Sequence, residues 1–380
     1  MSSPFHDLVA RGIFKNDGNG TCRSFAADSH AEPITGDLLL HQLMWYIAAG
    51  CAGFAILTGT LLTILHISHY REPHVQRQLI RILWTSPIFA IFSFLAVFSY
   101  HITEYMVPII ELYEAFAMVS VFFLMLWHLS HTTNLDDQIR IVTAIPYTPT
   151  KKRDRGPYTP AMFRITYIAV LQTLPVHIIT TIAAWIVTAT KCTGSDANKH
   201  WHTAISLIDI ISVVICIGKG ELPFLFRFKN ELRQADPKIF FKLLAFKAIV
   251  ILTALQQFVF KILDSTGTLD PTRTMSYSDL NMGLNSFVTA IEAAIFCVLL
   301  IPAFWPREFR EKRYLAATQG ELEMGANGGK YHSNGQVVNG QGEVLAPRKV
   351  NFFRAVLHSV NMIDVIQAVG RAVKLLGKKL

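Results

Sequence analysis

Residues 43–67 read LMWYIAAGCAGFAILTGTLLTILHI, twenty-five consecutive positions without a single Asp, Glu, Lys or Arg. A helix needs about 20 mostly apolar residues to cross the hydrocarbon core of a bilayer. A run of this length is rare in soluble proteins and longer than the apolar core of a secretion signal. The stretch therefore predicts a transmembrane helix.

Six further apolar stretches of similar length follow, at residues 83–102, 105–129, 163–188, 204–226, 240–263 and 284–304. The whole chain of 380 residues is 51% hydrophobic and only 16% charged, whereas soluble domains average about 25% charged residues. These patterns predict an all-α integral membrane protein with seven transmembrane helices, spanning a domain from residue 43 to residue 305.

The distribution of basic residues predicts the orientation of the spans, because cytosolic loops collect Lys and Arg. We assign Arg71, Arg77 and Arg81 to the loop after the first span. The loops after the first, third and fifth spans hold fifteen basic residues, against four in the alternate loops. The odd-numbered loops are therefore expected in the cytosol, with the N-terminus outside or lumenal and the C-terminus cytosolic.

The extracytosolic N-terminal segment, residues 1–42, carries two candidate modifications. Asn19 begins an Asn-Gly-Thr glycosylation sequon on the side that the charges require. Cys22 and Cys192 both fall on this oxidising side, so we expect a disulfide between them, with two unpaired thiols as the alternative.

The cytosolic tail divides into two parts. Residues 306–350 are rich in Gly, Asn and Gln and are expected to form a disordered linker. Residues 351–380 predict a basic amphipathic helix, whose apolar positions recur at steps of three or four: Phe353, Val356, Val360, Ile363, Ile366, Val369, Val373 and Leu376. This stripe could bind the anionic cytosolic leaflet, bind a partner protein, or pack against the protein's own cytosolic loops.

Polar side chains inside the predicted spans indicate a solute path. An ionisable group near the bilayer centre costs roughly 2.5–3.5 kcal/mol, so it calls for a reason. A water-accessible cavity opening away from the cytosol would explain the set Glu114, Gln172, His177, Asp209, Gln256 and Glu292. The alternative is hydrogen bonding that only joins helices, which we favour for Glu111 and Gln257.

Other functional classes lack their motifs. Only His177 lies clearly in the middle of a span, so no histidine pair is placed to hold haem. The sequence contains no phosphate-binding glycine loop, zinc-type spacing or nucleophile elbow. The third span ends at Trp127 and His128 without the acid-arginine pair of many seven-span receptors. We therefore expect no enzyme activity, metal, cofactor or nucleic-acid partner.

Several motifs together resemble one family. Residues 76–98, QRQLIRILWTSPIFAIFSFLAVF, resemble the second-span signature of the organic solute transporter alpha-subunit and transmembrane protein 184 family, also called the domain of unknown function 300 group. Its YEAF and VLQ motifs resemble residues 113–116 and 170–172. Its later landmarks resemble Lys242, Lys247 and Gln256, and then Ile291 with Glu292. The resemblance covers roughly residues 40–305.

The resemblance implies a seven-span fold and transport of amphipathic solutes such as bile acids and steroid conjugates. It also implies a vacuolar or other endomembrane location, as for fungal relatives, with the plasma membrane as the alternative. Two differences weaken an expectation of anionic substrates: His177 stands where relatives carry Arg or Lys, and Asp209 stands where they tend to have Asn. A third difference is that residues 146–160 lack the cysteine cluster of many relatives, so we do not expect lipid attachment at that loop.

Two hypotheses follow. The first is a permease for amphipathic organic solutes, sterol-like or lipidic, with the six polar residues along its path. The second is a vacuolar membrane scaffold whose terminal helix recruits a cytosolic, autophagy-related partner. The expected partners are the lipid bilayer, such a solute or cytosolic protein, and further subunits in a homo- or hetero-oligomer.

Overall fold

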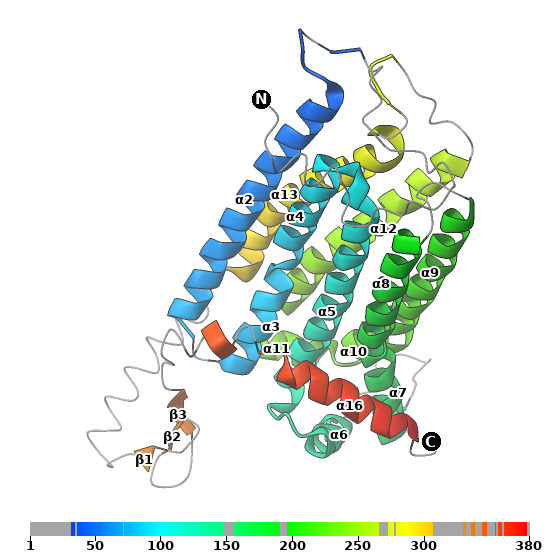
Figure 1. Ribbon diagram of the computed structural model, residues 1–380. Coiled ribbons are helices and arrows are strands. Elements are labelled where there is room, and N and C mark those ends of the chain that lie inside the picture. Colours follow the sequence, from blue (N-terminus) through cyan, green and yellow to red (C-terminus); the bar gives the residue numbers. More distant parts are fainter. Residues whose placement is uncertain are drawn as a thin grey trace.

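A computed structural model describes residues 32–34, 36–70, 72–146, 156–190, 196–265, 273–276, 279–306, 330–331, 336–338, 344–347, 354, 356–358 and 361–377. Seven membrane-spanning segments form the bundle (Figure 1). They comprise α2 (Leu40–Ser68), α3 with α4 (Pro73–Leu83, Thr85–Phe98), η1 with α5 (Tyr100–Ile102, Thr103–Ser130), α7 with α8 (Pro160–Leu171, Thr173–Thr190), α9 with η2 and α10 (Asp196–Ile215, Cys216–Glu221, Leu222–Arg227), α12 (Ile239–Ser265) and α13 (Leu284–Phe304).

The remaining described elements are short and lie between or after the spans. They are the helices α6 (Leu135–Ala144) and α11 (Lys229–Ala235), the π-helix η3 (Asp279–Gly283), and the C-terminal helix α16 (Ile363–Gly377). Within the predicted linker, β1 (Lys330–Tyr331), β2 (Gln336–Val338) and β3 (Val344–Pro347) form a small antiparallel sheet in that order. Lys330 pairs with Val338, and Val337 pairs with Ala346.

The seven-helix, all-α membrane fold predicted from the sequence is confirmed. The second span differs from the prediction of residues 83–102, because its helix begins at Pro73 and ends at Phe98. Hydropathy left the first turns of this helix out of the predicted span, because they carry Arg77, Gln78 and Arg81. All three are buried in the helix rather than exposed in a loop.

Exposed apolar side chains mark the lipid-facing surface. Large hydrophobic residues are solvent-exposed along the outer faces of the bundle, for example Leu57 on α2, Ile179 on α8, Ile211 on α9 and Leu255 on α12. A soluble monomer rarely exposes apolar patches this extensive. The structure therefore supports contact with the lipid bilayer on these faces.

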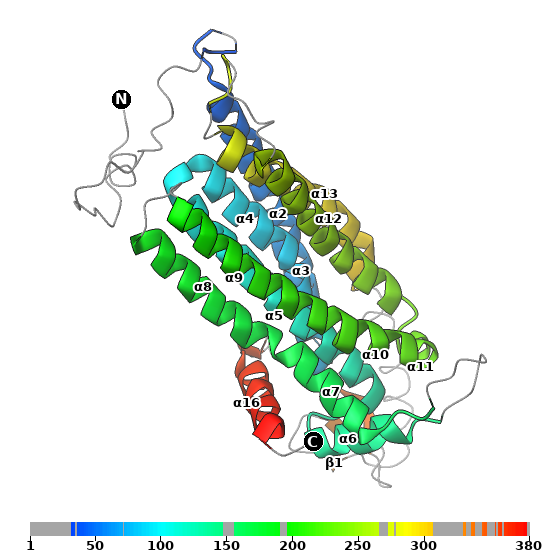
Figure 2. The ribbon, with the colours of Figure 1, turned by 90° about the vertical axis from the view of Figure 1, so that its right-hand side faces the viewer.

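Helix packing places α4 and α5 at the centre of the bundle. The helix α4 packs against α2, α5 and α13, and α5 packs against α3, α4 and α8. The helix α12 packs against α13, while α9 packs against α8. Figure 2 shows α12 and α13 on one side of the central pair and α8 and α9 on the other.

Prolines account for the interruptions in three spans. Proline lacks an N–H and its ring clashes with the carbonyl four residues earlier, so a helix kinks or breaks just before it. The break at Trp84 precedes Pro87, and the break at Gln172 precedes Pro175. The π-helix η2 immediately precedes Pro223.

The helix α16 lies transverse to the spans, beside α7 at the end where α3 begins (Figures 1 and 2). Its buried face consists of the small residues Val365, Ala368 and Ala372. Most of the predicted apolar stripe points elsewhere, since Ile366 is 69% exposed and Val373 is 61% exposed. Of the three alternatives for this helix, the structure shows packing against the protein's own bundle.

Candidate functional site

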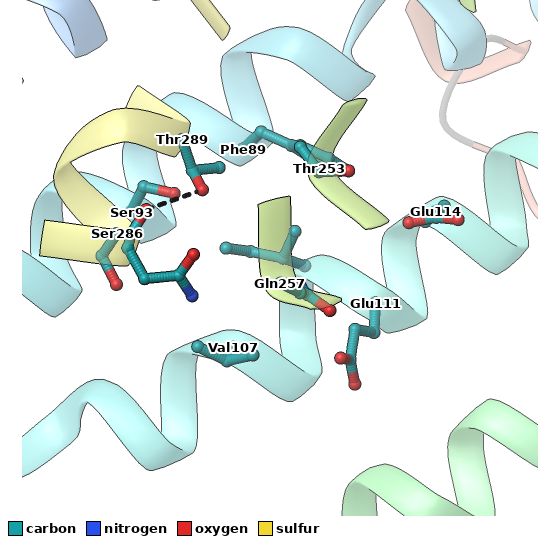
Figure 3. Close-up of a pocket in the computed structure, with 11 residues that line it drawn as sticks. Phe89, Ser93, Val107, Glu111, Glu114, Thr253, Gln257, Ser286 and Thr289 are labelled. Atoms are coloured by element: carbon teal, nitrogen blue, oxygen red, sulfur yellow. Dashed lines mark hydrogen bonds between the residues drawn. The ribbon is translucent and has the colours of Figure 1, made fainter. Parts of the chain in front are cut away.

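A polar cavity lies between α4, α5, α12 and α13 (Figure 3). Eleven residues line it: Phe89, Ser93, Val107, Ile110, Glu111, Glu114, Thr253, Gln257, Asn285, Ser286 and Thr289. Hydroxyl, amide and carboxylate groups dominate this wall, which lies inside a membrane-spanning bundle. The cavity is therefore the strongest candidate for a solute site among the described residues.

The cavity lies mainly in the half of the bundle away from α16. Ser93 is near the end of α4, Gln257 lies in the last third of α12, and Asn285 is at the start of α13. All three helix ends are opposite the end at which α3 begins. If the charge-based orientation holds, the cavity belongs to the outer or lumenal half of the membrane.

The helix α5 supplies both carboxylates of the cavity. Glu111 and Glu114 are three residues apart, a spacing that puts them on the same face of a helix, and Figure 3 shows both side chains on α5 facing the segment of α12 that carries Gln257. Glu114 lies within electrostatic reach of Glu111, Glu221 and Lys247. The acidic wall thus connects with charged groups deeper in the bundle.

A partly buried ion pair continues this line of polar groups toward the end of the bundle that carries α16. Lys247 of α12 pairs with Glu221 at the end of η2, and Glu221 is only 2% exposed. Close packing holds η2 in place, because a Cβ on Gly220 would collide with the side chain of Val170 on α7. Two buried opposite charges inside the membrane stabilise each other where neither could remain alone.

A second ion pair lies at the first turn of α12, which we expect to face the cytosol. The Nζ atom of Lys242 donates a hydrogen bond of 2.8 Å to Asp236, and both side chains are 5% exposed. The charged and polar groups along α5 and α12 therefore extend from the cavity to the cytosolic end. We call this set, Glu111, Glu114, Glu221, Asp236, Lys242, Lys247 and Gln257, the α5–α12 polar column.

Gln256 joins α12 to the wall of the cavity. Its side-chain amide donates to the backbone carbonyl of Asn285 at 2.7 Å, to its Oδ1 at 2.8 Å, and to the hydroxyl of Thr289 at 3.2 Å. Both partners line the cavity. Gln256 therefore supports the site from behind, while its neighbour Gln257 faces the cavity directly.

Three other predicted path residues lie together at a different interface, between the α7–α8 span and α9. Gln172 donates to the carbonyl of Ser212 at 3.1 Å and accepts from its hydroxyl at 3.2 Å. His177 Nδ1 lies 3.3 Å from Asp209 Oδ1, which also accepts a hydrogen bond of 2.7 Å from Thr180. These polar groups bind one another across the helices, and we call this the closed α8–α9 interface; the Nε2 atom of His177 is buried there without a hydrogen-bond partner among the described residues.

Glu292 lies alone on α13. It does not line the cavity, and its Oε2 atom is buried without a hydrogen-bond partner among the described residues. Of the six predicted residues, the structure thus places Glu114 in the cavity, Gln256 behind its wall, three at the α8–α9 interface and Glu292 apart.

The path predicted from the sequence omitted several residues that line the cavity or belong to the α5–α12 polar column. Glu111 and Gln257 were expected only to join helices, yet both line the cavity. Glu221 lies inside the predicted fifth span, residues 204–226, and Asp236 lies in the loop after it; neither was included in the predicted path. An acidic residue inside an apolar span is a signal that could have identified Glu221.

The cavity in this conformation is small. It offers about 20 Å³ to the centres of water-sized molecules, which is enough for a water molecule but not for an organic solute. Its oxygen atoms can accept hydrogen bonds from a hydroxyl or amine. A larger solute would require α4 and α5 to separate from α12 and α13.

Several predicted sites fall outside the described residues. These are Asn19, Cys22, Cys192, Phe353 and Val360. The three described cysteines, Cys51, Cys216 and Cys297, are free thiols within spans. Within the described ranges, no group of three or more His, Cys, Asp or Glu side chains could hold a metal ion.

The chain is similar to two membrane proteins of other organisms. The chain is 35% identical over 86 residues to the vacuole membrane protein hfl11 of Schizosaccharomyces pombe, covering 22% of this chain and 20% of that protein. It is 24% identical over 280 residues to a transmembrane protein 184 homolog of Dictyostelium discoideum, covering 69% of this chain and 52% of that protein. The matches thus span about a fifth and about half of these relatives. No solved structure matches the chain.

A family model covers most of the membrane domain. The model of the organic solute transporter Ostalpha matches residues 44–309, which include all seven spans and every residue of the cavity. This chain therefore belongs to the organic solute transporter Ostalpha family.

Proposed function

We propose that the protein is a permease that carries amphipathic organic solutes across an endomembrane, with the polar cavity as its solute-binding site. The observation that carries this proposal is the cavity itself, lined by two carboxylates, two amides and several hydroxyls within an apolar bundle. Membership of a solute transporter family supports a transport role. The fission yeast relative, a vacuole membrane protein, supports the endomembrane location.

The lining of the cavity favours solutes whose polar end is neutral or cationic. Glu111 and Glu114 share one wall, so any charge that this wall carries is negative and would repel an ionised sulfate or carboxylate. A hydroxyl or amine could donate hydrogen bonds to the same carboxylates. We therefore expect a hydroxysteroid or a lipid amine to bind better than a steroid sulfate.

The α5–α12 polar column supports an inward route from this site. Its ion pairs, Glu221 with Lys247 and Asp236 with Lys242, lie between the cavity and the cytosolic end. Their rearrangement would be needed for passage, because the cavity as described admits only a water molecule. Alternate opening toward each membrane face is common in transporters.

Uptake by proteoliposomes tests this proposal. Vesicles containing the purified protein should accumulate a labelled hydroxysteroid saturably, and a steroid sulfate should compete poorly. In the double variant Glu111→Gln, Glu114→Gln, competition by the sulfate should improve because the repelling charges are gone. Absence of saturable uptake of every hydroxylated or amine-bearing solute tried, with folded protein present, would refute the permease.

A second candidate function is a membrane scaffold that recruits a cytosolic protein through α16. The exposed apolar side chains Ile363, Ile366 and Val373 favour it, because they form an uncovered strip on this helix. Deleting residues 351–380 would not separate the candidates, since it also removes contacts to the bundle. The variant Ile366→Ser, Val373→Ser changes only exposed positions: it should abolish a scaffold's function and leave solute uptake intact.

A further inference from the structure

Two buried arginines at the cytosolic end of the bundle share a single carboxylate. Arg77 and Arg81 are one turn apart on α3, and their side chains are 10% and 5% exposed. Arg77 Nη2 lies 3.0 Å from Asp364 Oδ2, and Arg81 Nη2 lies 2.9 Å from Asp364 Oδ1. Asp364 comes from α16, almost three hundred residues away in the chain.

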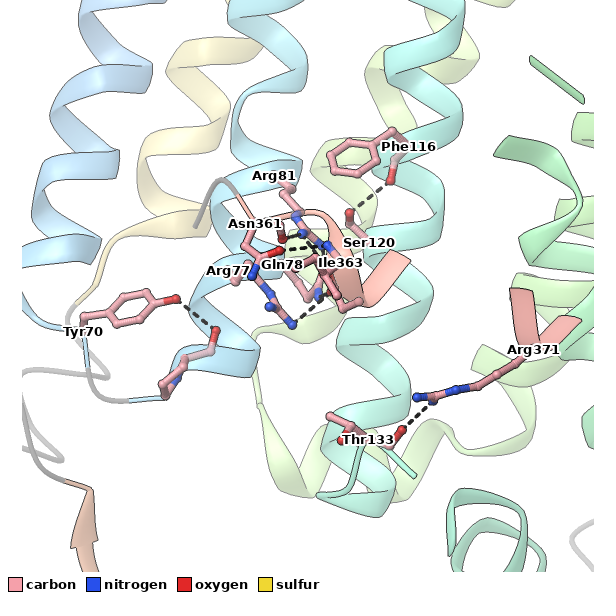
Figure 4. Close-up of polar contacts among 12 residues, drawn as sticks. Tyr70, Arg77, Gln78, Arg81, Phe116, Ser120, Thr133, Asn361, Ile363 and Arg371 are labelled. Atoms are coloured by element: carbon pink, nitrogen blue, oxygen red, sulfur yellow. Dashed lines mark hydrogen bonds and ion pairs between the residues drawn. The ribbon is translucent and has the colours of Figure 1, made fainter. Parts of the chain in front are cut away.

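The guanidinium and amide groups around Asp364 form a site that holds an anion (Figure 4). Arg81 binds both carboxylate oxygens, with its Nη1 donating to Oδ2 at 3.0 Å. Gln78 donates to the same oxygen at 3.2 Å. A paired set of guanidinium donors of this kind also matches the oxygens of a phosphate group.

The charges in this site do not balance. Two guanidinium groups face one carboxylate, and the buried Nε of Arg77 has no hydrogen-bond partner among the described residues. A phosphate monoester carries about −1.5 to −2 charges at pH 7 and more acceptor oxygens than a carboxylate. It would neutralise both arginines and offer an acceptor to the unpaired nitrogen.

The carboxylate is held by a helix with a small contact area. The buried face of α16 is made of Val365, Ala368 and Ala372, with Val369 and Leu375 partly buried beside them, whereas Ile366 and Val373 are exposed. Besides the Asp364 cluster, Arg81 donates to the carbonyl of Asn361 at 2.6 Å, and Arg371 donates to that of Thr133 at 2.9 Å. Polar contacts thus contribute to holding α16 on the bundle, and an anion can compete with them.

The site lies near one end of a membrane-spanning helix, the depth at which lipid phosphates are expected. Arg77 and Arg81 occupy the second and third turns of the span that begins at Pro73, and both extend toward α16 at the cytosolic end. Long basic side chains near helix ends commonly reach the headgroup region in this way.

We propose that Arg77, Gln78 and Arg81 form a binding site for a phosphate monoester, and that phosphate binding displaces Asp364 and releases α16 from the bundle. The phosphate can come from a phosphorylated lipid headgroup or from a soluble phosphate. Phosphate lipids would then set the exposure of the C-terminal helix, independently of the cavity between α4, α5, α12 and α13.

Hydrogen exchange in lipid nanodiscs tests the proposal on the full chain. Amides of residues 363–377 should exchange faster when phosphatidylinositol 4-phosphate is added to phosphatidylcholine. A parallel sample receives soluble inositol hexakisphosphate in phosphatidylcholine discs. Release in either sample supports the anion site and identifies its source; unchanged exchange in both overturns it.

Variants separate this site from nonspecific charge effects. Arg77→Gln keeps the two contacts between Arg81 and Asp364, and it should need about tenfold more phosphate lipid for release. Arg140→Gln is the matched control, because Arg140 is exposed and pairs only with Asp137 within α6 among its described contacts. Equal responses of the two variants would contradict the proposal.

A third variant removes the competing carboxylate. Asp364→Asn should bind phosphate lipid more tightly than the wild type, because the arginines lose their internal anion. Protection of the buried thiol of Cys297 from a maleimide dye reports that the bundle stays folded in each variant. Unchanged or weaker binding by folded Asp364→Asn protein would also overturn the proposal.

Discussion

The two polar regions on either side of the central helices differ in how their side chains are satisfied. At the α8–α9 interface, Gln172 pairs with Ser212, and Asp209 pairs with His177 and Thr180. In the cavity, the side chains of Glu114 and Gln257 line the space between α4, α5, α12 and α13. Both regions read alike in the sequence, as polar residues inside apolar spans.

The difference shows that intramembrane polarity has two uses. Mutually bonded groups hold helices together, as at the α8–α9 interface. Groups that face a cavity are available to a solute and so indicate a path. Substitutions in the two regions should therefore differ in their effects on stability and on solute uptake.

The largest loss of stability is expected from breaking the Glu221–Lys247 ion pair. Lys247→Met leaves Glu221 buried without its cation, a change that typically costs about 3–5 kcal/mol. The free energy of unfolding can be followed by thermal exposure of the buried Cys297 thiol. Adding Glu221→Gln to Lys247→Met should recover much of the lost free energy of unfolding. Lys238→Met makes the same substitution at an exposed position and is the control. A stable Lys247→Met single variant would show that the pair does not hold the column together.

A smaller loss of stability is expected at the closed interface. Asp209→Ala leaves the hydroxyl of Thr180 and the ring of His177 without their acceptor, which costs about 1–3 kcal/mol. Solute uptake per folded molecule should stay unchanged, because Asp209 does not line the cavity. Uptake and folded fraction should be measured on the same preparation. A fall in uptake beyond the fall in folded protein would place Asp209 on the path.

Filling the cavity should lower uptake even in the fraction of protein that stays folded. Ser93 is 1% exposed, lines the cavity, and has a hydroxyl without a described hydrogen-bond partner. Ser93→Leu overpacks this site at a cost of about 1–3 kcal/mol, and it should reduce the maximal rate of hydroxysteroid uptake per folded molecule severalfold by occupying the site. Gly53→Leu on α2 places a leucine where an added Cβ would meet open space, so it is the control. Equal rates in the two variants would argue against passage through this cavity.

The smallest effect concerns pH at the α3–α16 contact. Burial alone would raise the pKa of Asp364, but the hydrogen bond and charge of Arg81 and the charge of Arg77 outweigh it and hold this pKa below its ordinary 3.8. Tyr70 and His74 also lie within electrostatic reach of Asp364.

A lowered carboxyl pKa stabilises docking above about pH 4, and this contribution is lost as the pH falls through the folded-state value. Hydrogen exchange of residues 363–377 should thus be unaffected by titration of Asp364 between pH 7 and pH 5, after correction for intrinsic exchange rates, and α16 should be released only below the ordinary carboxyl pKa of 3.8. Release between pH 7 and pH 5 would show that another group controls docking.

The apolar stretches were sufficient to predict the seven spans. A segment needs about 20 residues to cross the hydrocarbon core as a helix, and a helix hydrogen-bonds its own backbone groups where no water can do so. It misplaced the start of the second span, since Arg77 and Arg81 are satisfied by Asp364, a partner that no local window contains. It left three roles open for the apolar stripe of α16, and the structure packs Val365, Ala368 and Ala372 against the bundle while Ile366 and Val373 are exposed.

The candidate path was predicted only in part. Residue type identified Glu114 correctly as polar and intramembrane, but gave the same weight to Asp209, whose partners come from another helix. Whether a polar group is bonded or free depends on how helices are rotated about their axes. That rotation is set by packing over the whole bundle, which a single sequence does not reveal.

The most direct test compares two substitutions that each replace one intramembrane acid by its amide. Uptake of a labelled hydroxysteroid per folded molecule should be measured for Glu114→Gln in the cavity and Asp209→Asn at the closed interface. The cavity account predicts at least a severalfold change for Glu114→Gln and wild-type uptake for Asp209→Asn. Wild-type uptake by Glu114→Gln together with altered uptake by Asp209→Asn would contradict it and move the solute path to the α8–α9 interface.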